Sequence, residues 1–368
     1  MSNLYVGVMS GTSANAIDAA LVDFCQKMPQ IVATHTEMIA PELQQAIHAF
    51  ASIGPNELDR LAEIDIAIAQ LSAKTINRLL DKAGITPDKV KAVGSHGQTI
   101  RHQPIGKLRY TFQVGDANII TAMTGITTVA DFRRRDLALG GQGAPLTPIF
   151  HQQMFSHNSI PRIVLNLGGI ANISILPSTA HSSLLGFDTG PANTLLDLWS
   201  QKHLQRAYDD KGEWASQGSI HIDLLNALLD DPYFAKTTPK STGLEYFNHI
   251  WLEKYLEKFP PITPVDVQTT LTELTALCIS KAIDQYYPQG EIIVCGGGAY
   301  NDYLLQRLKA NSPMHVINTS STYGIAPEWI EAVAFAWLAK LTIHHQPGNV
   351  PSVTGANSQA ILGAIYQA

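Results

Sequence analysis

A pair of short apolar segments joined by a small polar loop opens this chain, and a similar pair recurs near its middle. Leu4–Met9 and Ala19–Phe24 form the first pair, and Arg162–Leu167 and Ile173–Leu176 form the second. Each pair predicts a β-hairpin, because short runs of Val, Ile and Leu bounded by Gly and small polar residues are typical of strands. The repetition indicates that one α/β unit has been duplicated.

The length of the chain also favours two domains. A single hydrophobic core rarely organises as many as 368 residues. We place the boundary where the strand predicted at Thr127–Ala130 runs into 131–145, a Gly- and Arg-rich stretch that looks too irregular for a strand or a helix. The predicted first lobe is 1–128 plus 345–368, and the predicted second lobe is 129–344.

Helical segments alternate with these strands. Residues 57–83 carry apolar side chains at helical spacing and end at Gly84, which suits a helix C-cap. Other helices are expected from Pro264 to Tyr287, over 328–341, and in a short stretch from Gln359. Alternation of strands and helices favours parallel pairing whereas hairpins are antiparallel, so the sheets are expected to be mixed.

Charge and composition exclude several classes of function. The net charge is −6 and the longest basic run is Arg133-Arg134-Arg135, so no nucleic-acid partner is expected. No apolar run is long enough for a membrane helix and no signal-peptide pattern is present, which predicts a cytoplasmic protein without a membrane partner. Cys25, Cys278 and Cys295 lack a CxxC spacing and sit in apolar sequence, so we expect buried thiols rather than disulfides.

Two loops carry candidate chemistry. Gly11–Asp18, directly after Ser10, offers main-chain N–H groups and hydroxyls to an anion such as phosphate, although such loops are also common as plain surface turns. Asp188 lies where a strand leads into a helix at Gly186–Asn193. Its carboxylate could act on a metal, a water or a substrate hydroxyl, or it could simply cap the helix.

Three further segments lie at strand ends. Gly296–Gly298 follows an apolar strand and lets a flat ring or a phosphate approach the backbone, but the segment is not GxGxxG, because Asn301 stands at the third Gly position. His96 and Gln98 are placed to bind a substrate, and the guanidinium of Arg133 suits a carboxylate or a phosphate. HExxH, GxSxG and Walker A patterns are absent, which disfavours zinc hydrolases, serine esterases and P-loop enzymes.

Seen together, the two hairpins, the Asp188 corner and the late glycine run resemble the actin-like, hexokinase and Hsp70 superfamily. Finer motifs resemble the anhydro-N-acetylmuramic acid kinase family over essentially the whole chain. Those motifs are Val8–Ser13, Gly94–Ile100, Asp131–Arg133, Gly140–Leu146, Asn166–Asn172, Gly186–Pro191 and Cys295–Asn301.

The resemblance implies an α/β, two-lobed actin-like ATPase (ribonuclease H-like) fold with mixed sheets and a central nucleotide cleft. It also implies a cytoplasmic, homodimeric enzyme of peptidoglycan recycling that uses ATP and Mg²⁺. The enzyme would open 1,6-anhydro-N-acetylmuramic acid with water and phosphorylate O6, which gives N-acetylmuramic acid 6-phosphate. An ordinary sugar kinase that phosphorylates a hydroxyl is the alternative, and a non-catalytic ATP-driven switch or a repressor is a third possibility.

By this resemblance, Asp188 is the general base that activates water at C1, and Asp18 is a metal ligand. The residues expected to bind ATP are Gly11, Thr12, Ser13, Ala14, Asn15, Ala16, Ile17, Asp18, Gly168, Gly169, Asn172, Gly296, Gly297 and Gly298. The residues expected to bind the sugar are His96, Gln98, Asp131, Arg133 and Glu331.

The first loop departs from the family pattern at two positions. The family usually has Asp and Gly where this chain has Asn15 and Ala16. An amide offers Mg²⁺ no anionic charge, and Ala tolerates a positive φ poorly. We therefore expect weaker metal binding than the family pattern gives and a strained loop if the backbone at Ala16 is left-handed.

Overall fold

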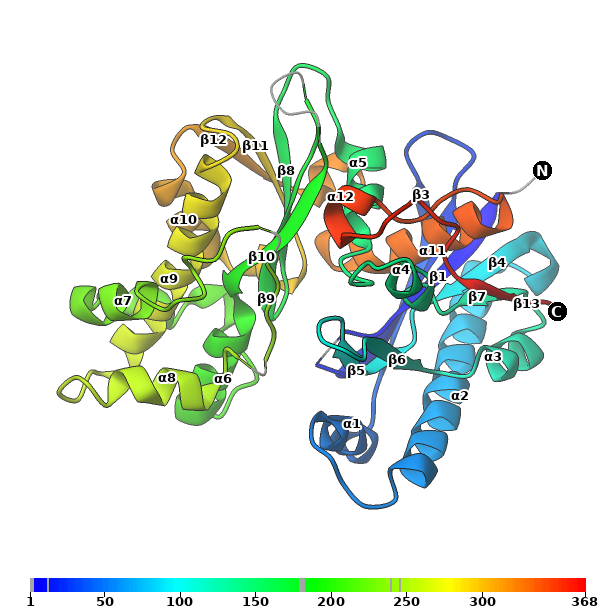
Figure 1. Ribbon diagram of the computed structural model, residues 1–368, viewed down its shortest axis with the longest axis horizontal. Helices are drawn as coiled ribbons and strands as arrows, with labels where there is room; N and C mark the ends of the chain where they lie inside the picture. Colours follow the sequence, from blue (N-terminus) through cyan, green and yellow to red (C-terminus); the bar gives the residue numbers. More distant parts are fainter. Residues whose placement is uncertain (1–2, 12, 179–182, 239, 245) are drawn as a thin grey trace. The chain divides into compact units, whose positions relative to one another are not determined.

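A computed structural model describes residues 3–11, 13–178, 183–238, 240–244 and 246–368, and the chain forms two compact units (Figure 1). Unit 1 comprises Met1–Phe150 and Trp329–Ala368, and unit 2 comprises His151–Glu328. These limits differ from the predicted lobes, because residues 129–150 and 329–344 lie in unit 1. The physical reason is packing, since helix α11 (Ile330–Ile343) lies against the central strands of the first sheet.

Unit 1 is built on a six-stranded sheet of order β13-β7-β4-β1-β2-β3. The pairs β1–β2, β2–β3 and β7–β13 are antiparallel, whereas β1–β4 and β4–β7 are parallel. The mixed sheet and the first hairpin are thus confirmed. The strands are β1 (Leu4–Met9), β2 (Ala16–Asp23), β3 (Gln30–Met38), β4 (Val90–Ser95), β7 (Thr128–Ala130) and β13 (Ala364–Tyr366).

Two helices cover opposite faces of this sheet. Val6 and Val8 of β1 belong to the apolar core that includes Ile68 and Ile76 of α2 (Glu57–Ala83). Gly7, which alternates with them along the strand, faces α11 instead. The remaining helices of this unit are α1 (Pro41–His48), α3 (Ala117–Thr124), α4 (Arg134–Ala138) and α12 (Pro351–Thr354).

Unit 2 repeats the same strand pattern in a five-stranded sheet of order β10-β9-β8-β11-β12. Here β8–β9 and β9–β10 are antiparallel, whereas β8–β11 and β11–β12 are parallel. In both units the first three strands form an antiparallel meander and the next two add in parallel beside the first strand. The strands are β8 (Arg162–Leu167), β9 (Ile170–Ile175), β10 (Leu185–Pro191), β11 (Gly290–Cys295) and β12 (His315–Thr319).

Helices α9 and α10 pack their apolar side chains on the core of this second sheet. A second apolar cluster joins α9 to α6, α7 and α8 and contains Trp199, Phe247 and Trp251. The helices are α6 (Asn193–Leu204), α7 (Ile222–Leu229), α8 (His249–Leu256), α9 (Pro264–Asp284) and α10 (Asp302–Asn311), and α5 (Thr147–Phe155) precedes β8. The shared strand order of the two sheets confirms the predicted α/β architecture with mixed sheets and a repeated unit.

Several local predictions were wrong. The chain from Gln359 ends in β13 and not in a helix, because Ala364–Tyr366 pairs with β7. The stretch 131–145, predicted to be irregular, contains the short helix α4. Tyr110–Val114 forms β6, which pairs with an unpredicted strand β5 (Gln98–Gln103) in a separate two-stranded sheet.

The cysteine and membrane predictions have separate outcomes. Cys278 and Cys295 are buried as expected, whereas Cys25 is exposed, and none of the three forms a disulfide in the described part of the chain. Among the described residues, no helix is both long enough and apolar enough to cross a membrane.

Candidate active site

The first candidate element is the turn between β1 and β2 in unit 1. The buried Ser10 hydroxyl lies 2.6 Å from Gln98 Oε1 and 3.0 Å from the main-chain oxygen of Ala16. The amide of Ala14 donates to the Gly11 oxygen at 3.0 Å, which closes a tight turn. Thr12 lies outside the described residues. The structure therefore brings Ser10, Gly11 and Gln98 together, with the Gln98 side chain bonded to the turn.

Helix α1 braces this turn from the side. Gln44 Nε2 donates to the Ser13 oxygen at 3.0 Å and to Asn15 Oδ1 at 2.5 Å, and His48 Nε2 lies 3.1 Å from the Ser13 oxygen. The side-chain oxygen of Asn15 thus accepts a hydrogen bond from Gln44. Sequence reasoning missed both supporting residues, because nothing local relates a surface helix to the turn.

The expected strain at Ala16 is absent. Ala16 begins β2 and pairs with Met38, and the left-handed residue is Ala14 with φ of +50°. The left-handed backbone of a buried Ala is strained, and the contacts around Ala14 must offset that strain. Ile17 is also buried in the sheet core, so only its main chain is available to a ligand.

Two glycines let α11 approach the sheet closely, next to Glu331. Gly7 and Gly94 lie opposite each other on β1 and β4, and a Cβ on either would come within 1.8 Å of Ala332 O and 2.1 Å of Phe335 O, respectively. The glycines let the helix backbone rest on the strands and place Glu331 in the first turn of α11. Burial raises the pKa of Glu331, Arg133 opposes the rise, and Asp18 adds to it.

Asp18 lies on β2. The hydroxyl of Thr36 donates to Asp18 Oδ1 at 2.7 Å. The charge of Asp18 also contributes to the raised pKa of Glu331.

Arg133 and His96 form a buried contact beside these carboxylates. Arg133 Nε and Nη2 lie 3.1 and 2.9 Å from His96 Nε2, and Arg133 Nη1 donates to the Gly143 oxygen at 2.8 Å. Since Nε2 accepts from a guanidinium, the neutral ring carries its proton on Nδ1. Burial, and then the charge of Arg133, hold the pKa of His96 well below its usual range.

Arg133 itself remains a cation at neutral pH. Burial lowers its pKa to about 10, while Glu331 and Asp136 oppose that shift. The nearby Asp131 is a left-handed residue with φ of +60°, and its carboxylate lies 3.6 Å from Arg134 Nη1. Burial raises the pKa of Asp131 as well.

Asp136 is a supporting residue that sequence reasoning did not assign. Its fully buried carboxylate accepts from Gly143 N at 2.7 Å, Asn349 Nδ2 at 2.8 Å and Thr354 Oγ1 at 2.7 Å. These bonds fix the loop whose Gly143 oxygen binds Arg133 and tie it to the C-terminal segment. The second Asp of the run Asp131–Asp136 was the available signal.

In unit 2, Asp188 is held by three hydrogen bonds to one neighbouring segment. Its amide donates to Lys240 O at 3.1 Å, its Oδ2 accepts from Thr242 N at 2.9 Å, and its main-chain oxygen accepts from the Tyr233 hydroxyl at 2.8 Å. The N-cap position of α6 is Ala192, whereas the Asp188 carboxylate accepts from Thr242 N. Sequence reasoning missed the three partners, and the small polar residues near Lys240 were the only hint.

The β8–β9 turn supports the same corner. The oxygens of Gly168 and Gly169 accept from the first amides of α6, at Asn193 and Thr194, at 3.1 Å each. Asn172 lies opposite Asp188 in the β9–β10 register. The structure thus places Gly168, Gly169, Asn172 and Asp188 at one end of the second sheet.

The glycine run after β11 has two different roles. A Cβ on Gly296 or Gly298 would lie 2.4 Å from Asn166 Oδ1 or 2.7 Å from Leu167 Cβ, so packing requires both glycines. Gly296 also has φ of +80°. Gly297 has nothing within 4 Å of its Cβ position, which leaves its backbone open to a flat ligand.

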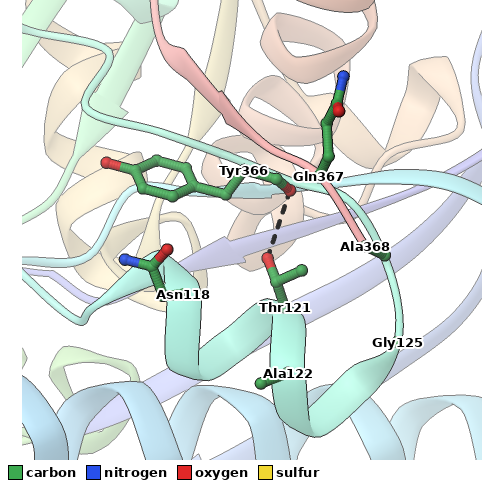
Figure 2. Close-up of a pocket in the computed structure, with 7 residues that line it drawn as sticks. All are labelled: Asn118, Thr121, Ala122, Gly125, Tyr366, Gln367 and Ala368. Carbon is green, nitrogen blue, oxygen red and sulfur yellow. Dashed lines mark hydrogen bonds between the residues drawn. The ribbon is translucent and has the colours of Figure 1, made fainter.

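A pocket of about 460 Å³ lies elsewhere in unit 1, between α3 and the C-terminal strand (Figure 2). Thr121 Oγ1 donates to the Tyr366 oxygen at 3.4 Å at its edge. Its lining contains none of the predicted site residues: it consists of Asn118, Thr121, Ala122, Gly125, Tyr366, Gln367 and Ala368.

Comparison with known proteins places this geometry in a family. The model of the anhydro-N-acetylmuramic acid kinase family matches residues 3–368. The chain belongs to this family. An anhydro-N-acetylmuramic acid kinase of Coxiella burnetii (strain Dugway 5J108-111) is 50% identical over 98% of this chain and 97% of that protein. One of Shewanella amazonensis (strain ATCC BAA-1098 / SB2B) is 49% identical over 100% of this chain and 99% of that protein.

Solved structures show more distant similarity. The activator of the 2-hydroxyisocaproyl-CoA dehydratase from Clostridium difficile, with bound ADPNP, matches with a TM-score of 0.46 and 12% identity, over 90% of this chain and 92% of that one. Membership of the anhydro-N-acetylmuramic acid kinase family confirms the predicted family and the kinase class. The roles of individual residues stay predictions.

Proposed function

We propose that this protein converts 1,6-anhydro-N-acetylmuramic acid, water and ATP into N-acetylmuramic acid 6-phosphate and ADP, as a step of peptidoglycan recycling. The family match over residues 3–368 supports the substrate. The observation that carries the mechanism is the fixed carboxylate of Asp188, whose Oδ2 accepts a main-chain hydrogen bond from Thr242. We also propose a cytoplasmic homodimer, on the family resemblance.

Asp188 is the general base in this proposal. A hydrogen bond from a main-chain amide favours the ionised carboxylate, which is the form that accepts a proton. Asp188 takes a proton from water as the water oxygen bonds to C1 of the sugar. The C1–O6 bond breaks, O6 bonds to the γ-phosphorus, and ADP leaves with the electrons of the bond between the β and γ groups.

Main-chain groups are proposed to bind the nucleotide. The turn Gly11–Asp18 supplies N–H groups for the phosphates, and its bracing by Gln44 fixes their direction. Gly168, Gly169 and Asn172 are proposed to line the nucleotide site. Gly296–Gly298 faces the adenosine, with Gly297 as the position where the backbone is open.

The sugar site is proposed to use His96, Gln98, Asp131, Arg133 and Glu331. Arg133 keeps its positive charge, and its guanidinium suits the carboxylate of a muramic acid. The neutral His96 accepts from Arg133 through Nε2 and so fixes the guanidinium that would bind the sugar.

The carboxylates of unit 1 fit a magnesium ion. No cluster of three or more His, Cys, Asp or Glu residues occurs in the described ranges. Mg²⁺ commonly uses only one or two carboxylates together with water and substrate phosphates. Asp18 would hold it, with Glu331 nearby, and the ion would neutralise charge on the phosphates.

The position of isotopic oxygen tests this mechanism. In ¹⁸O-water, with products read by rapid quench before the hemiacetal exchanges, we expect label at C1 and none in the phosphate ester. Label in the phosphoryl group would contradict the proposed ring opening. A phosphorylated product with the anhydro ring intact would favour an ordinary sugar kinase.

A further inference from the structure

Unit 2 contains a buried carboxylate with an unusual number of hydrogen-bond donors. Asp231 is 5% exposed and lies just after α7. Its oxygens accept from the Tyr246 hydroxyl at 2.7 Å, the Trp251 indole at 2.8 Å, the Tyr255 hydroxyl at 2.9 Å and the Tyr233 amide at 2.9 Å. Four donors on one carboxylate orient it completely.

The four donors outweigh the cost of burial. Burial alone would raise the pKa of Asp231, but the hydrogen bonds from Trp251, Tyr233, Tyr246 and Tyr255 bring the pKa below its ordinary value. The carboxylate is therefore ionised at neutral pH inside an aromatic cluster. Burying an ion costs stability unless it is fully bonded, and apolar residues often stabilise such a position as well. The stability of the fold alone therefore does not explain an ionised Asp at position 231.

The donors belong to the segment that holds Asp188. Tyr233 and Tyr246 lie at the two ends of residues 233–246, so Asp231 ties both ends to one point. Between those ends, the segment makes all three bonds to Asp188 described above, through Tyr233, Lys240 and Thr242. Movement of these ends would therefore displace the Thr242 amide, which donates to the Asp188 carboxylate.

Further contacts hold Tyr233 in place. The Tyr233 ring is buried, and its centroid lies 5.3 Å from that of Phe247 in an edge-on contact. Lys240 Nζ lies 5.0 Å over the Tyr233 ring and 3.4 Å from the Phe234 oxygen. Tyr233 bonds to Asp231 through its amide and to Asp188 through its hydroxyl, so it links the positions of the two residues.

We propose that Asp231 is a positioning residue for the reaction, which fixes the orientation of the Asp188 carboxylate through residues 233–246. The inference rests on the proposed role of Asp188 as the base. Asp231 touches neither substrate nor nucleotide in this proposal. Its effect appears in the chemical step and not in ligand affinity.

The test is Asp231→Asn in the full chain, with steady-state kinetics from pH 5 to 9 on Mg²⁺-ATP and the anhydro sugar. The amide keeps the shape but presents an NH₂ group to the donors, so the segment shifts. We expect kcat to fall about tenfold while KM for both substrates changes little. Loss of the Thr242 bond disfavours the ionised Asp188, so the acid limb of kcat should move to higher pH.

Other titratable groups at this corner do not produce that limb. Burial raises the pKa of Tyr233, raises that of Cys278 to about 12, and lowers that of Lys240. Tyr233 and Cys278 therefore stay protonated across the acid limb. Asp197 of α6, whose pKa is raised to about 7, also titrates in this range, so a shift that persists in the Asp197→Asn background reports Asp188.

Matched variants separate positioning from folding. Glu291→Gln changes another buried carboxylate of unit 2, which binds Arg162, Asn318 and Tyr323, and it should lower stability without moving the acid limb. Tyr246→Phe removes one donor if Asp231→Asn does not fold, and it should give the same shift at smaller size. Unchanged kcat and acid limb in folded Asp231→Asn would overturn the inference. Near-normal turnover of Asp188→Asn would instead overturn the proposed base.

Discussion

The two units share one strand order but differ in the chemistry at equivalent strand ends. In unit 1, the strand β4 ends near His96, which binds Arg133, and α11 carries Glu331, whose raised pKa reflects in part the charge of Asp18. In unit 2, the equivalent strand β11 ends in Gly296–Gly298, which carries no side-chain chemistry. The charged groups of unit 1 suit a sugar acid and a metal, whereas unit 2 combines open backbone with one fixed carboxylate.

One strand order can therefore carry different chemistry in its two copies. The strand pairings determine where chain ends emerge, and the same pairings recur in both sheets. The residues beyond the strands determine what each end can bind. Glycine at a strand centre, as at Gly7 and Gly94, brings a helix down to the sheet, whereas glycine beyond a strand, as at Gly297, leaves backbone accessible.

The largest expected effect concerns Asp188, the fixed carboxylate of unit 2. Asp188→Asn should lower kcat at least about a hundredfold, because an amide cannot take the proton of water. ATP binding, measured by calorimetry, should stay within about twofold, since the nucleotide contacts are proposed on other residues. Turnover near that of the parent protein would mean that another group is the base.

Two glycine substitutions test the difference between a glycine within a strand and a glycine beyond its end. Gly94→Ala should destabilise the protein by about 2–3 kcal/mol, because its Cβ would meet the Phe335 oxygen at 2.1 Å. Gly297→Ala is the matched control, with nothing within 4 Å, and it should unfold at nearly the parental denaturant midpoint. Equal midpoints for both variants would show that α11 can shift away from the sheet at little cost in stability.

The two units are also expected to respond oppositely to pH. Burial, and then Asp209, raise the pKa of Asp197 in unit 2 to about 7, whereas Lys74, and then Arg78, lower the pKa of Glu37 in unit 1 to about 2. The folded state holds the Asp197 proton more tightly than the unfolded chain does, so this stability is present below pH 4 and is lost as pH rises to 7. The Glu37 contribution is present above pH 4.5 and is lost as pH falls towards 2.

Thermal unfolding of two variants checks this pH response. Asp197→Asn should raise Tm at pH 8 by roughly 2–4 °C, equivalent to about 1 kcal/mol, and should leave it unchanged at pH 4. Glu37→Gln should lower Tm at pH 8 and lose that effect as the pH approaches 2. A gain of Asp197→Asn that is the same at both pH values would contradict the titration.

The smallest effect concerns Asn15 in the turn of unit 1. Asn15→Asp should lower the Mg²⁺ concentration for half-maximal activity by roughly threefold, because a carboxylate adds charge near the phosphates. Ala16 should not interfere, since it lies in β2 and the left-handed residue is Ala14. Superimposable Mg²⁺ titrations would remove any role of this position in metal binding.

The local sequence pattern was sufficient to predict the helices and strands whose apolar residues are regularly spaced. The first hairpin, the helix at 57–83 and the strand at Arg162–Leu167 were predicted close to their observed bounds, because apolar spacing and a C-cap glycine are local signals. Elements that depend on a distant partner were missed. β3 is a partly exposed strand without a clear apolar alternation, and β13 exists because β7 offers it an edge.

The repeated α/β plan, the family, and the residues at the turn and at the Asp188 corner could be predicted without a structure, because each depends on a run of neighbours along the chain. The distant groups that contact these residues became visible only in the folded protein. Gln44 braces the turn, Asp136 ties the Arg133 loop to Asn349, and the segment after Asp231 grips Asp188. These contacts join residues tens to hundreds of positions apart, and the packing of helices and sheets alone brings them within hydrogen-bond distance.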